Sequence, residues 1–432
     1  MKTSNPFVRG LRLILVGIVA AACNLVNPES GVSPGRGTSG GDDGRKEEAS
    51  PASGGRLLTA AVGFPADYDW KRDTAASAVR GASVLLLHGT DTLLCIPAGA
   101  GTSVGTSPDM IHYMGGHLYT EYSDAASTVL CRDGVEILRF GGREMLRGIM
   151  PVGDLLYTLW QPRSGAGGFC LRRDGEILYM RSDGRVAGAV GDAGYGPCGA
   201  LYEDRGEVVF GFFRDSVTGD PEVYLYRAGK AGRVAVPTGV SQVYDVRQSG
   251  GSIYLAGALE TGEKPVLARD ADICDLSDGI SEERIYSMQL FPRDGRVGLI
   301  GCYRQVYSGH ARGKYFDLYC TGIWDGGDGT LADVGSRPPG IFFGEGYVCS
   351  DGSRTVFVRT HAGRLFDITE HNTDHLEPPD GYTLCGSRCT LMRGGRLYLA
   401  LTSAEGGPPA IWNEGEVVEV PINGCLAGIY SE

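Results

Sequence analysis

Short apolar segments recur along the chain after residue 57, and apolar and polar residues alternate within most of them. The clearest unit runs from Gly148 to Tyr179 and contains four such segments, with turns at Val152–Asp154 and Arg173–Gly175. A period of two predicts half-buried strands, because successive side chains of a strand point to opposite faces. After the amino-terminal segment, no stretch of about ten residues shows the apolar spacing of a helix.

The second strand of this unit recurs at irregular spacings of roughly 40 to 60 residues. Its copies are Leu118–Thr120, Leu156–Thr158, Val209–Gly211, Ile253–Leu255, Gly298–Ile300, Val356–Val358 and Leu397–Leu399. Several copies follow a glycine-containing tight turn, where glycine accepts the positive φ that such turns need. A repeat of this size with four strands per copy is typical of a β-propeller.

Seven full units are predicted, with inner strands near residues 111, 148, 199, 243, 286, 346 and 386. The segment Gly424–Tyr430 resembles an eighth inner strand, and Leu57–Val62, Val84–His88 and Leu93–Pro97 supply its three companions. Pairing of the two chain ends in one blade would close the ring and remove exposed sheet edges. The sequence therefore predicts an all-β propeller of eight four-stranded blades over residues 57–432. Seven blades, or a pair of β-sandwiches, are the alternatives.

The amino terminus has the features of an export signal. A positive start and a short apolar run precede small residues that end in cysteine: Lys2, Arg9, Arg12, Leu13–Val19 and Ala20–Cys23. The apolar run is too short for a comfortable membrane span, which favours a cleaved signal peptide. The ending resembles a bacterial lipobox, which implies removal of residues 1–22 and lipidation of Cys23. An ordinary signal peptide cut at Ala22 is the alternative.

Residues 23–56 are mostly glycine, serine, proline and charged residues, with no apolar period. Such a segment cannot bury enough surface to offset its ordering entropy, so we expect a disordered tether between the lipid and the propeller. Asn24 follows the cysteine, where Asp would resemble an inner-membrane retention signal. We therefore expect a lipid-anchored protein of the cell envelope, held through Cys23 in the outer membrane.

Composition narrows the class of partner. The 432 residues include 68 glycines, more than twice the usual share, which marks many turns between short strands. The formal net charge of -12 argues against a nucleic-acid partner, because no basic surplus is available to release phosphate counterions.

Eleven cysteines follow Cys23, and an odd count leaves at least one of them unpaired. Several lie inside strand patterns; Cys131 and Cys170 occupy similar places in third strands. We expect most of them to be free, buried residues that behave as small hydrophobes.

No motif in a credible context indicates a metal, a cofactor or a catalytic nucleophile. Glu370–His375 is the only dense cluster of ligand-type residues, and its place between strand patterns and before Pro378 favours a polar loop over a metal site. Gly101–Gly105 has the spacing of a nucleophile elbow but no helix follows it. We therefore assign no catalytic residue and expect no cofactor.

One set of residues is the candidate ligand-binding surface. Asp67–Asp73 joins two aromatic residues to three carboxylates and could line a sugar site, although a packed rim loop is the alternative. Loops between second and third strands commonly share the binding face of a propeller with the connections between blades. The predicted set, in or near such loops, is Trp70, Trp160, Arg163, Tyr303, Tyr307 and His310.

Taken together, the chain resembles a Bacteroidales-type lipoprotein with a propeller domain, a group without an assigned reaction. The resemblance rests on Ala20–Cys23, on the recurrent Leu/Ile-Tyr strands and on units such as Ala410–Val417. We expect a non-enzymatic binding or scaffold protein that presents a propeller face to a glycan or a protein partner. A carbohydrate-active hydrolase or lyase, with its site at the channel mouth, is the alternative. A structural partner within an envelope complex is a third possibility and predicts a large apolar patch.

Overall fold

The structure is a computed structural model, and its described part is interrupted by several gaps. It describes residues 56–70, 82–97, 111–123, 127–142, 144–162, 167–187, 199–214, 222–259, 264–270, 272–275, 284–293, 296–308, 315–324, 331–337, 346–351, 354–359, 364–367, 374–376, 378–384 and 389–432. Cys23, Arg163 and His310 lie outside these residues, as do the predicted signal peptide and nearly all of the predicted tether.

The described strands form eight antiparallel sheets, which we number as blades along the chain. Blade 1 contains, from inside to outside, β34 (Gly424–Ser431), β1 (Leu57–Gly63), β2 (Ser83–His88) and β3 (Asp91–Pro97). Blade 2 contains β4 (Ile111–Met114), β5 (His117–Ser123), β6 (Ser127–Arg132) and β7 (Val135–Gly141). Blade 3 contains β8 (Glu144–Val152), β9 (Leu155–Pro162), β10 (Phe169–Arg173) and β11 (Glu176–Arg181). Blade 4 contains β12 (Arg185–Val186), β13 (Tyr202–Asp204), β14 (Glu207–Arg214), β15 (Glu222–Arg227) and β16 (Lys230–Val234).

The remaining four blades follow the same order. Blade 5 contains β17 (Val240–Ser249), β18 (Ser252–Leu259), β19 (Lys264–Arg269) and β20 (Asp272–Asp275). Blade 6 contains β21 (Arg284–Arg293), β22 (Arg296–Ser308), β23 (Tyr315–Trp324) and β24 (Leu331–Arg337). Blade 7 contains β25 (Gly346–Ser350), β26 (Thr355–Arg359), β27 (Arg364–Asp367) and β28 (Asp374–Leu376). Blade 8 contains β29 (Tyr382–Leu384), β30 (Thr390–Arg393), β31 (Arg396–Ser403), β32 (Ala410–Asn413) and β33 (Glu416–Glu419).

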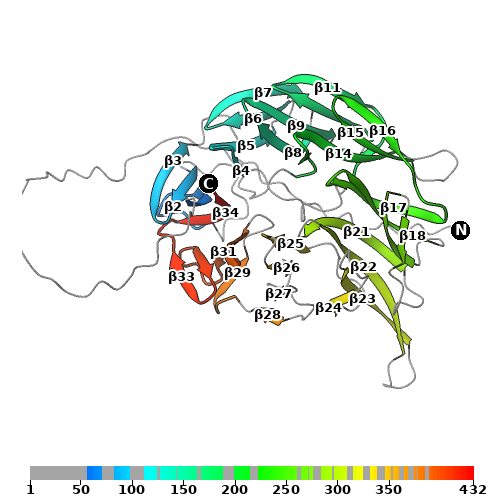
Figure 1. Cartoon of the computed structure of the whole chain (residues 1–432). Helices are drawn as coiled ribbons and strands as arrows, with labels where there is room; N and C mark the ends of the chain where they lie inside the picture. The colour runs from blue at the N-terminus through cyan, green and yellow to red at the C-terminus, as the bar shows by residue number, and fades with distance from the viewer. Residues whose placement is uncertain are drawn as a thin grey trace, which may run out of the picture.

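These sheets follow one another around a ring, as the colours of Figure 1 show. The second strand of blade 4, β14, touches the inner strand β17 of blade 5. The inner strands of the following blades touch from β17 through β21 and β25 to β30, and β34 touches both β30 and β4. Apolar clusters join blade 2 to blade 3 and blade 3 to blade 4. The propeller predicted from the sequence is confirmed. Its eight blades and closed ring stay predictions, which this packing supports.

The two ends of the described chain meet in blade 1. β1 pairs with β34 from Leu57 opposite Ser431 to Gly63 opposite Gly424. The backbone N–H of Glu432 also donates a 3.0 Å hydrogen bond to the carbonyl of Arg56. In Figure 1 the blue β2 and β3 accordingly lie beside the red β34.

In blades 4 and 8 the inner strand is divided into two pieces. β12 and β13 both pair with β14, and β29 and β30 both pair with β31. The single inner strands expected near residues 199 and 386 are therefore each two short strands.

Because each blade is an antiparallel meander in chain order, its connections alternate between two ends of the sheet. One end carries the turns between first and second and between third and fourth strands. We name this end the turn face; many of its turns contain two residues at positive φ, such as Gly115–Gly116 and Asp174–Gly175. The other end, the loop face, carries the connections between second and third strands and between blades. Arg56 and Glu432 lie at the turn face, since β1 runs from there toward the loop face.

Aspartates fix the turns between third and fourth strands. Asp133, Asp174 and Asp270 have φ between 47° and 57°, a region that Asp tolerates better than most residues. The Oδ1 atom of Asp174 accepts a 2.9 Å hydrogen bond from the N–H of Leu156, and the N–H of Asp174 donates to the carbonyl of Leu156 at 2.9 Å. The other two aspartates make the same pair of contacts with Leu118 and Ile253. The Arg-Asp pair that these three turns share in the sequence thus marks a structural turn.

The described core is mainly apolar, and the buried cysteines within it agree with the expectation from sequence. Among the described residues, Cys131 and Cys170 are free and buried, and Cys389 is buried as well. Cys131 and Cys170 lie in the third strands β6 and β10, as predicted.

Candidate functional site

The structure separates the residues that were predicted to bind a ligand. Trp70 lies on the loop face, in the connection that follows β1. Trp160 lies inside β9 rather than in a loop, and its side chain is fully buried. Tyr303 and Tyr307 lie in β22, toward its loop-face end. These four positions are spread over three blades, since only Tyr303 and Tyr307 share one.

Trp160 belongs to the contact between blades 2 and 3. Its ring meets the ring of Phe140 edge-on, with centroids 4.7 Å apart. The guanidinium carbon of Arg172 lies 4.7 Å from the centroid of the same Phe140 ring. Trp160 is therefore a packing residue in this conformation, and its burial explains why a strand pattern alone misplaced it on the surface.

Polar side chains also lie in this contact, which we call the 2–3 seam. The register places Glu121, Thr128 and His112 on the face of blade 2 that carries Tyr119 and Leu130 of the seam's apolar cluster. All three are buried. The backbone N–H of Glu144 from blade 3 donates a 3.0 Å hydrogen bond to Thr128 Oγ1.

Burial raises the pKa of the Glu144 carboxyl, while the charge of Arg172 acts in the opposite direction. Glu144 begins β8 and so lies at the loop-face end of the seam. A half-buried carboxyl with a raised pKa can hold a proton nearer neutral pH, which is a property of general acids. The sequence analysis did not identify Glu144, Glu121 or His112, because only the pairing of strands brings them together.

The second feature of the loop face is an aromatic loop, residues 64–70. The rings of Phe64 and Trp70 stack with centroids 5.8 Å apart and an interplanar angle of 15°, and Tyr68 packs on Phe64 at 5.5 Å. Asn423 fixes the loop from the connection before β34: its carbonyl accepts a 2.7 Å bond from Phe64 N–H, and its side-chain amide donates to the carbonyls of Pro65 and Tyr68. The aromatic rings are half-buried, and Asp67 and Asp69 are exposed beside them. The three rings of this loop therefore pack on one another and are also partly exposed to solvent.

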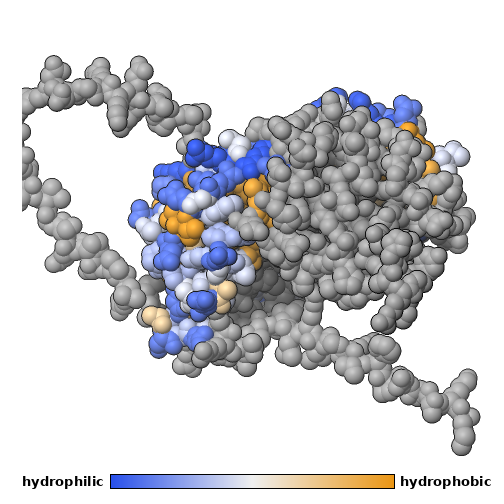
Figure 2. Space-filling view, turned by 90° about the horizontal axis from the view of Figure 1, so that it is seen from below, coloured by the Kyte–Doolittle hydropathy of each residue, from blue (hydrophilic) through white to orange (hydrophobic). Residues whose placement is uncertain are grey.

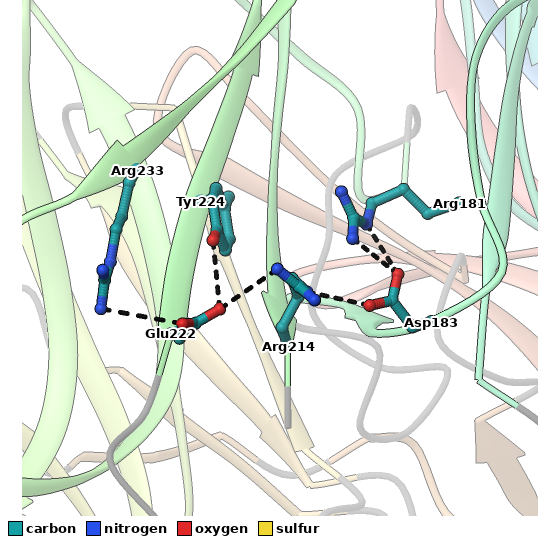
Figure 3. A network of polar contacts seen from close by, with 6 residues as sticks. All are labelled: Arg181, Asp183, Arg214, Glu222, Tyr224 and Arg233. Carbon is teal, nitrogen blue, oxygen red and sulfur yellow. Dashed lines mark hydrogen bonds and ion pairs between the residues drawn. The ribbon is translucent and has the colours of Figure 1, made fainter. Parts of the chain in front are cut away.

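The third feature is a network of arginines and carboxylates on the loop face of blades 3 and 4, shown in Figure 3. Asp183 bridges two of its arginines. One oxygen of Asp183 accepts from Arg181 Nε at 2.9 Å and contacts Arg181 Nη2 at 2.7 Å, while its other oxygen accepts from Arg214 Nε at 2.9 Å. Arg181 ends β11 and Arg214 ends β14, so Asp183 joins the two blades.

Glu222 continues this network within blade 4. It lies 3.4 Å from Arg214 Nη1 and 3.9 Å from Arg233 Nη2, and it accepts a 3.1 Å hydrogen bond from Tyr224 Oη. We name the six residues drawn in Figure 3 the arginine network: Arg181, Asp183, Arg214, Glu222, Tyr224 and Arg233.

Aromatic residues pack against the arginine network. Tyr224 stacks on Phe212 with centroids 5.1 Å apart at 8°, and the Arg181 guanidinium lies 6.0 Å from the Phe212 centroid. The hydrogen bond from Arg181, followed by that from Arg214, lowers the pKa of Asp183. Asp183 is therefore ionised at neutral pH and serves as an acceptor, which makes it a poor general acid. The sequence signal was weak, since arginines at strand ends become neighbours only through the register of two blades.

The described residues offer no obvious metal centre. Within the ranges given above, no group of three or more His, Cys, Asp or Glu side chains is placed to hold a metal ion. In the same part of the chain, no helix has the length and apolar character needed to cross a bilayer.

Comparisons with known proteins give fold-level likenesses only. No protein-family model matches the chain, and no curated protein matches it. Among solved structures, dihydro-heme d1 dehydrogenase NirN aligns with a TM-score of 0.46 and 16% identity over 87% of this chain and 75% of its own. AztD from Citrobacter koseri aligns with a TM-score of 0.42 and 11% identity over 87% of this chain and 97% of its own.

A third solved structure is itself described as a propeller. The β-propeller domain of the Trilobed protease from Pyrococcus furiosus aligns with a TM-score of 0.35 and 12% identity, over 65% of this chain and 84% of its own. At such identities and TM-scores, none of these proteins lends its activity to this chain.

Proposed function

We propose that this protein is a lipid-anchored binding module of the cell envelope, which presents its loop face to a glycan or a protein partner. One observation carries the proposal: both partly exposed clusters of chemically distinctive side chains, the aromatic loop and the arginine network, lie on the loop face. Half-exposed aromatic rings and guanidinium groups are the side chains that binding surfaces enrich.

The turn face is built differently. Its aspartates are used by backbone N–H groups, and Arg205 and Arg354 donate to the carbonyls of Gly250 and Gly395 in the following blades. Polar groups with such internal partners stabilise the blades and leave fewer donors and acceptors to bind a ligand.

The attachment of the proposed tether suits this arrangement. Lipidation at Cys23 and a tether over residues 23–56 would join the propeller at Arg56, which lies at the turn face. The loop face would then point away from the attachment point.

The location of the exposed apolar residues favours a polar ligand for the loop face. Large exposed hydrophobic side chains lie mainly on fourth strands, at the outer edge of the blades: Leu93, Val135, Ile177, Met180, Ile273, Val417 and Val418. In Figure 2 the coloured surface is mainly hydrophilic, with smaller hydrophobic areas between. A sugar, which presents hydroxyl groups and one apolar ring face, fits an aromatic ring beside the carboxylates of Asp67 and Asp69.

The test is a glycan array combined with a turnover assay on the purified full-length protein. We expect binding without product. We expect Trp70→Ala to weaken binding up to about tenfold while Trp70→Phe retains most of it, because a stacked ring contributes about 0.5–1.5 kcal/mol. Equal binding by both variants would move the site away from the aromatic loop. For the anchor, Cys23→Ser should abolish lipid incorporation and release the protein from the membrane fraction.

A second function, a carbohydrate-active enzyme, is favoured by the 2–3 seam. Glu144, whose pKa is raised by burial, shares this seam with the buried Glu121, so the seam offers two carboxylates. Released sugar in the turnover assay, abolished by Glu144→Gln and retained in Trp70→Phe, would establish the enzyme and replace the binding module.

A further inference from the structure

We propose that Arg181, Arg214 and Arg233 form a subsite for an anionic group, a carboxylate or a sulfate, carried by the glycan that the loop face binds. This inference rests on the proposed function and adds the chemical class of the ligand. Three properties of the arginine network support it: the charge balance, the unequal contact distances and the rigidity of the side chains.

The arginine network carries an excess of positive charge. Three arginines face two carboxylates, which leaves 3 - 2 = +1 in a chain whose formal net charge is -12. Two other networks among the described residues have the opposite balance. Arg227 pairs with both Asp204 and Glu207, and Arg354 pairs with two carboxylates of blades 7 and 8.

The contacts within the network are unequal. Asp183 is held at 2.7–2.9 Å by Arg181 and Arg214, the range of charge-assisted hydrogen bonds. Glu222 lies farther from its guanidinium groups, at 3.4 Å from Arg214 and 3.9 Å from Arg233. The distance from Arg233 exceeds the range of a hydrogen bond, so Arg233 Nη2 keeps donor capacity for an incoming oxygen. Arg214 is already engaged by hydrogen bonds with Tyr224 and Asp183, and it adds its positive charge to the subsite.

Access and rigidity are combined in the same residues. The side chain of Arg233 is 65% exposed and that of Arg214 is 37% exposed. The side chain of Arg214 is fixed by its hydrogen bond to Asp183. Beside it, Tyr224 of β15 stacks on Phe212 of β14. A guanidinium held in place loses less conformational entropy on binding, and its planar fork matches the two oxygens of a carboxylate or sulfate.

A purely structural role is the competing explanation, because Arg181, Asp183 and Arg214 clamp blade 3 to blade 4. The clamp needs Asp183 and its two close arginines, whereas it does not need Arg233, which makes one long contact and is mostly exposed. Arg233 therefore distinguishes a binding role from a clamp.

The experiment measures binding of three matched saccharides to the full-length protein by calorimetry: tetragalacturonate, its neutral methyl ester, and a sulfated galactan tetrasaccharide. We expect at least one anionic saccharide to bind about tenfold or more tightly than the neutral ester, and to weaken as salt rises. Arg233→Gln should weaken anionic binding about three- to tenfold. Arg269→Gln, which removes the same charge from an exposed arginine of the turn face, should leave it unchanged.

Each outcome decides between the possibilities. If the neutral ester binds as tightly as the anionic saccharides, the anionic subsite is wrong while the binding module stands. If Arg233→Gln and Arg269→Gln weaken binding equally, the effect is one of overall charge and the subsite is wrong. If no saccharide binds, glycan binding fails and the subsite with it. Arg214→Met, checked for folding by circular dichroism, should weaken anionic binding at least as much as Arg233→Gln.

Discussion

Asp245 Oδ2 accepts a 2.8 Å hydrogen bond from the backbone N–H of Leu290, and this bond joins the inner strands of blades 5 and 6. The other carboxylate oxygen accepts from the N–H of Val246 at 2.8 Å. Asp245 is 2% exposed and follows a bulge in β17. A buried carboxylate thus accepts two backbone N–H groups at a place where two blades meet.

Asp245→Ala should lower the free energy of unfolding by about 2–4 kcal/mol, since it leaves two buried N–H groups without acceptors. Urea unfolding followed by fluorescence measures the change. Glu203→Ala, which truncates an exposed carboxylate in β13, is the matched control and should change stability by less than about 0.5 kcal/mol. Equal midpoints for the two variants would mean that Asp245 does not hold the blades together.

Gly199 connects blades 3 and 4 through a close backbone approach. It has φ of +65°, forms a bridge with Gly148, and a Cβ atom there would lie 2.3 Å from the carbonyl oxygen of Arg147. Gly206 has a similar φ of +80°, but a Cβ atom there would meet nothing within 4 Å.

Gly199→Ala should therefore destabilise far more than Gly206→Ala, although both substitutions carry the same backbone cost of about 1–2 kcal/mol. The additional cost at Gly199 comes from moving blade 4 away from Arg147. Thermal unfolding of both variants measures the difference. A similar loss in both would show that positive φ alone explains the glycine at position 199.

Local features of the fold could be predicted from the sequence because their physics is local. The alternation around Leu156–Thr158 gives a strand directly, and the Asp174–Gly175 pair gives its turn because few residues adopt positive φ. The pairing of Leu57–Val62 with Gly424–Tyr430 followed from the need to complete a blade. The division of two inner strands could not be predicted, since the alternation of apolar and polar residues does not show which short segments pair with β14 and β31.

The candidate sites depend on contacts between blades, which the sequence does not display. Trp160 is of a residue type that is common in ligand-binding sites. Only its contact with Phe140 of the neighbouring blade shows that its side chain is buried. Arg214 and Asp183 are 31 residues apart and meet because two sheets are in register. Such pairs need the three-dimensional packing or a set of related sequences.

Trp160→Ala should cost about 3–5 kcal/mol of folding free energy, because it opens a cavity between blades 2 and 3. Trp160→Phe retains most of the apolar volume and should cost less than half as much. Ligand binding by the folded Trp160→Phe variant should equal that of the unchanged protein. Weakened binding without loss of stability would return Trp160 to the binding surface.

Alkaline pH should reveal the half-buried thiol of Cys349. Burial raises its pKa from 9.0 to about 11, against the opposing effect of hydrogen bonds with Thr390 and Met392. Between these two values the unfolded chain releases the thiol proton while the folded protein keeps it. The unfolded state then binds fewer protons, so the free energy of unfolding falls as pH rises from about 9 to 11, by about 2–3 kcal/mol in total.

Cys349→Ala removes this titration, so its stability should fall less steeply over the same pH range even if it is lower at pH 8. Urea unfolding at pH 8, 9 and 10 measures both slopes. The thiol should also resist iodoacetamide at pH 8 in the folded protein and react in urea, because the thiolate is the nucleophile and the site is covered. Parallel slopes for the two proteins, or rapid labelling of the folded one, would place Cys349 in contact with solvent and contradict its position between the inner strands of blades 7 and 8.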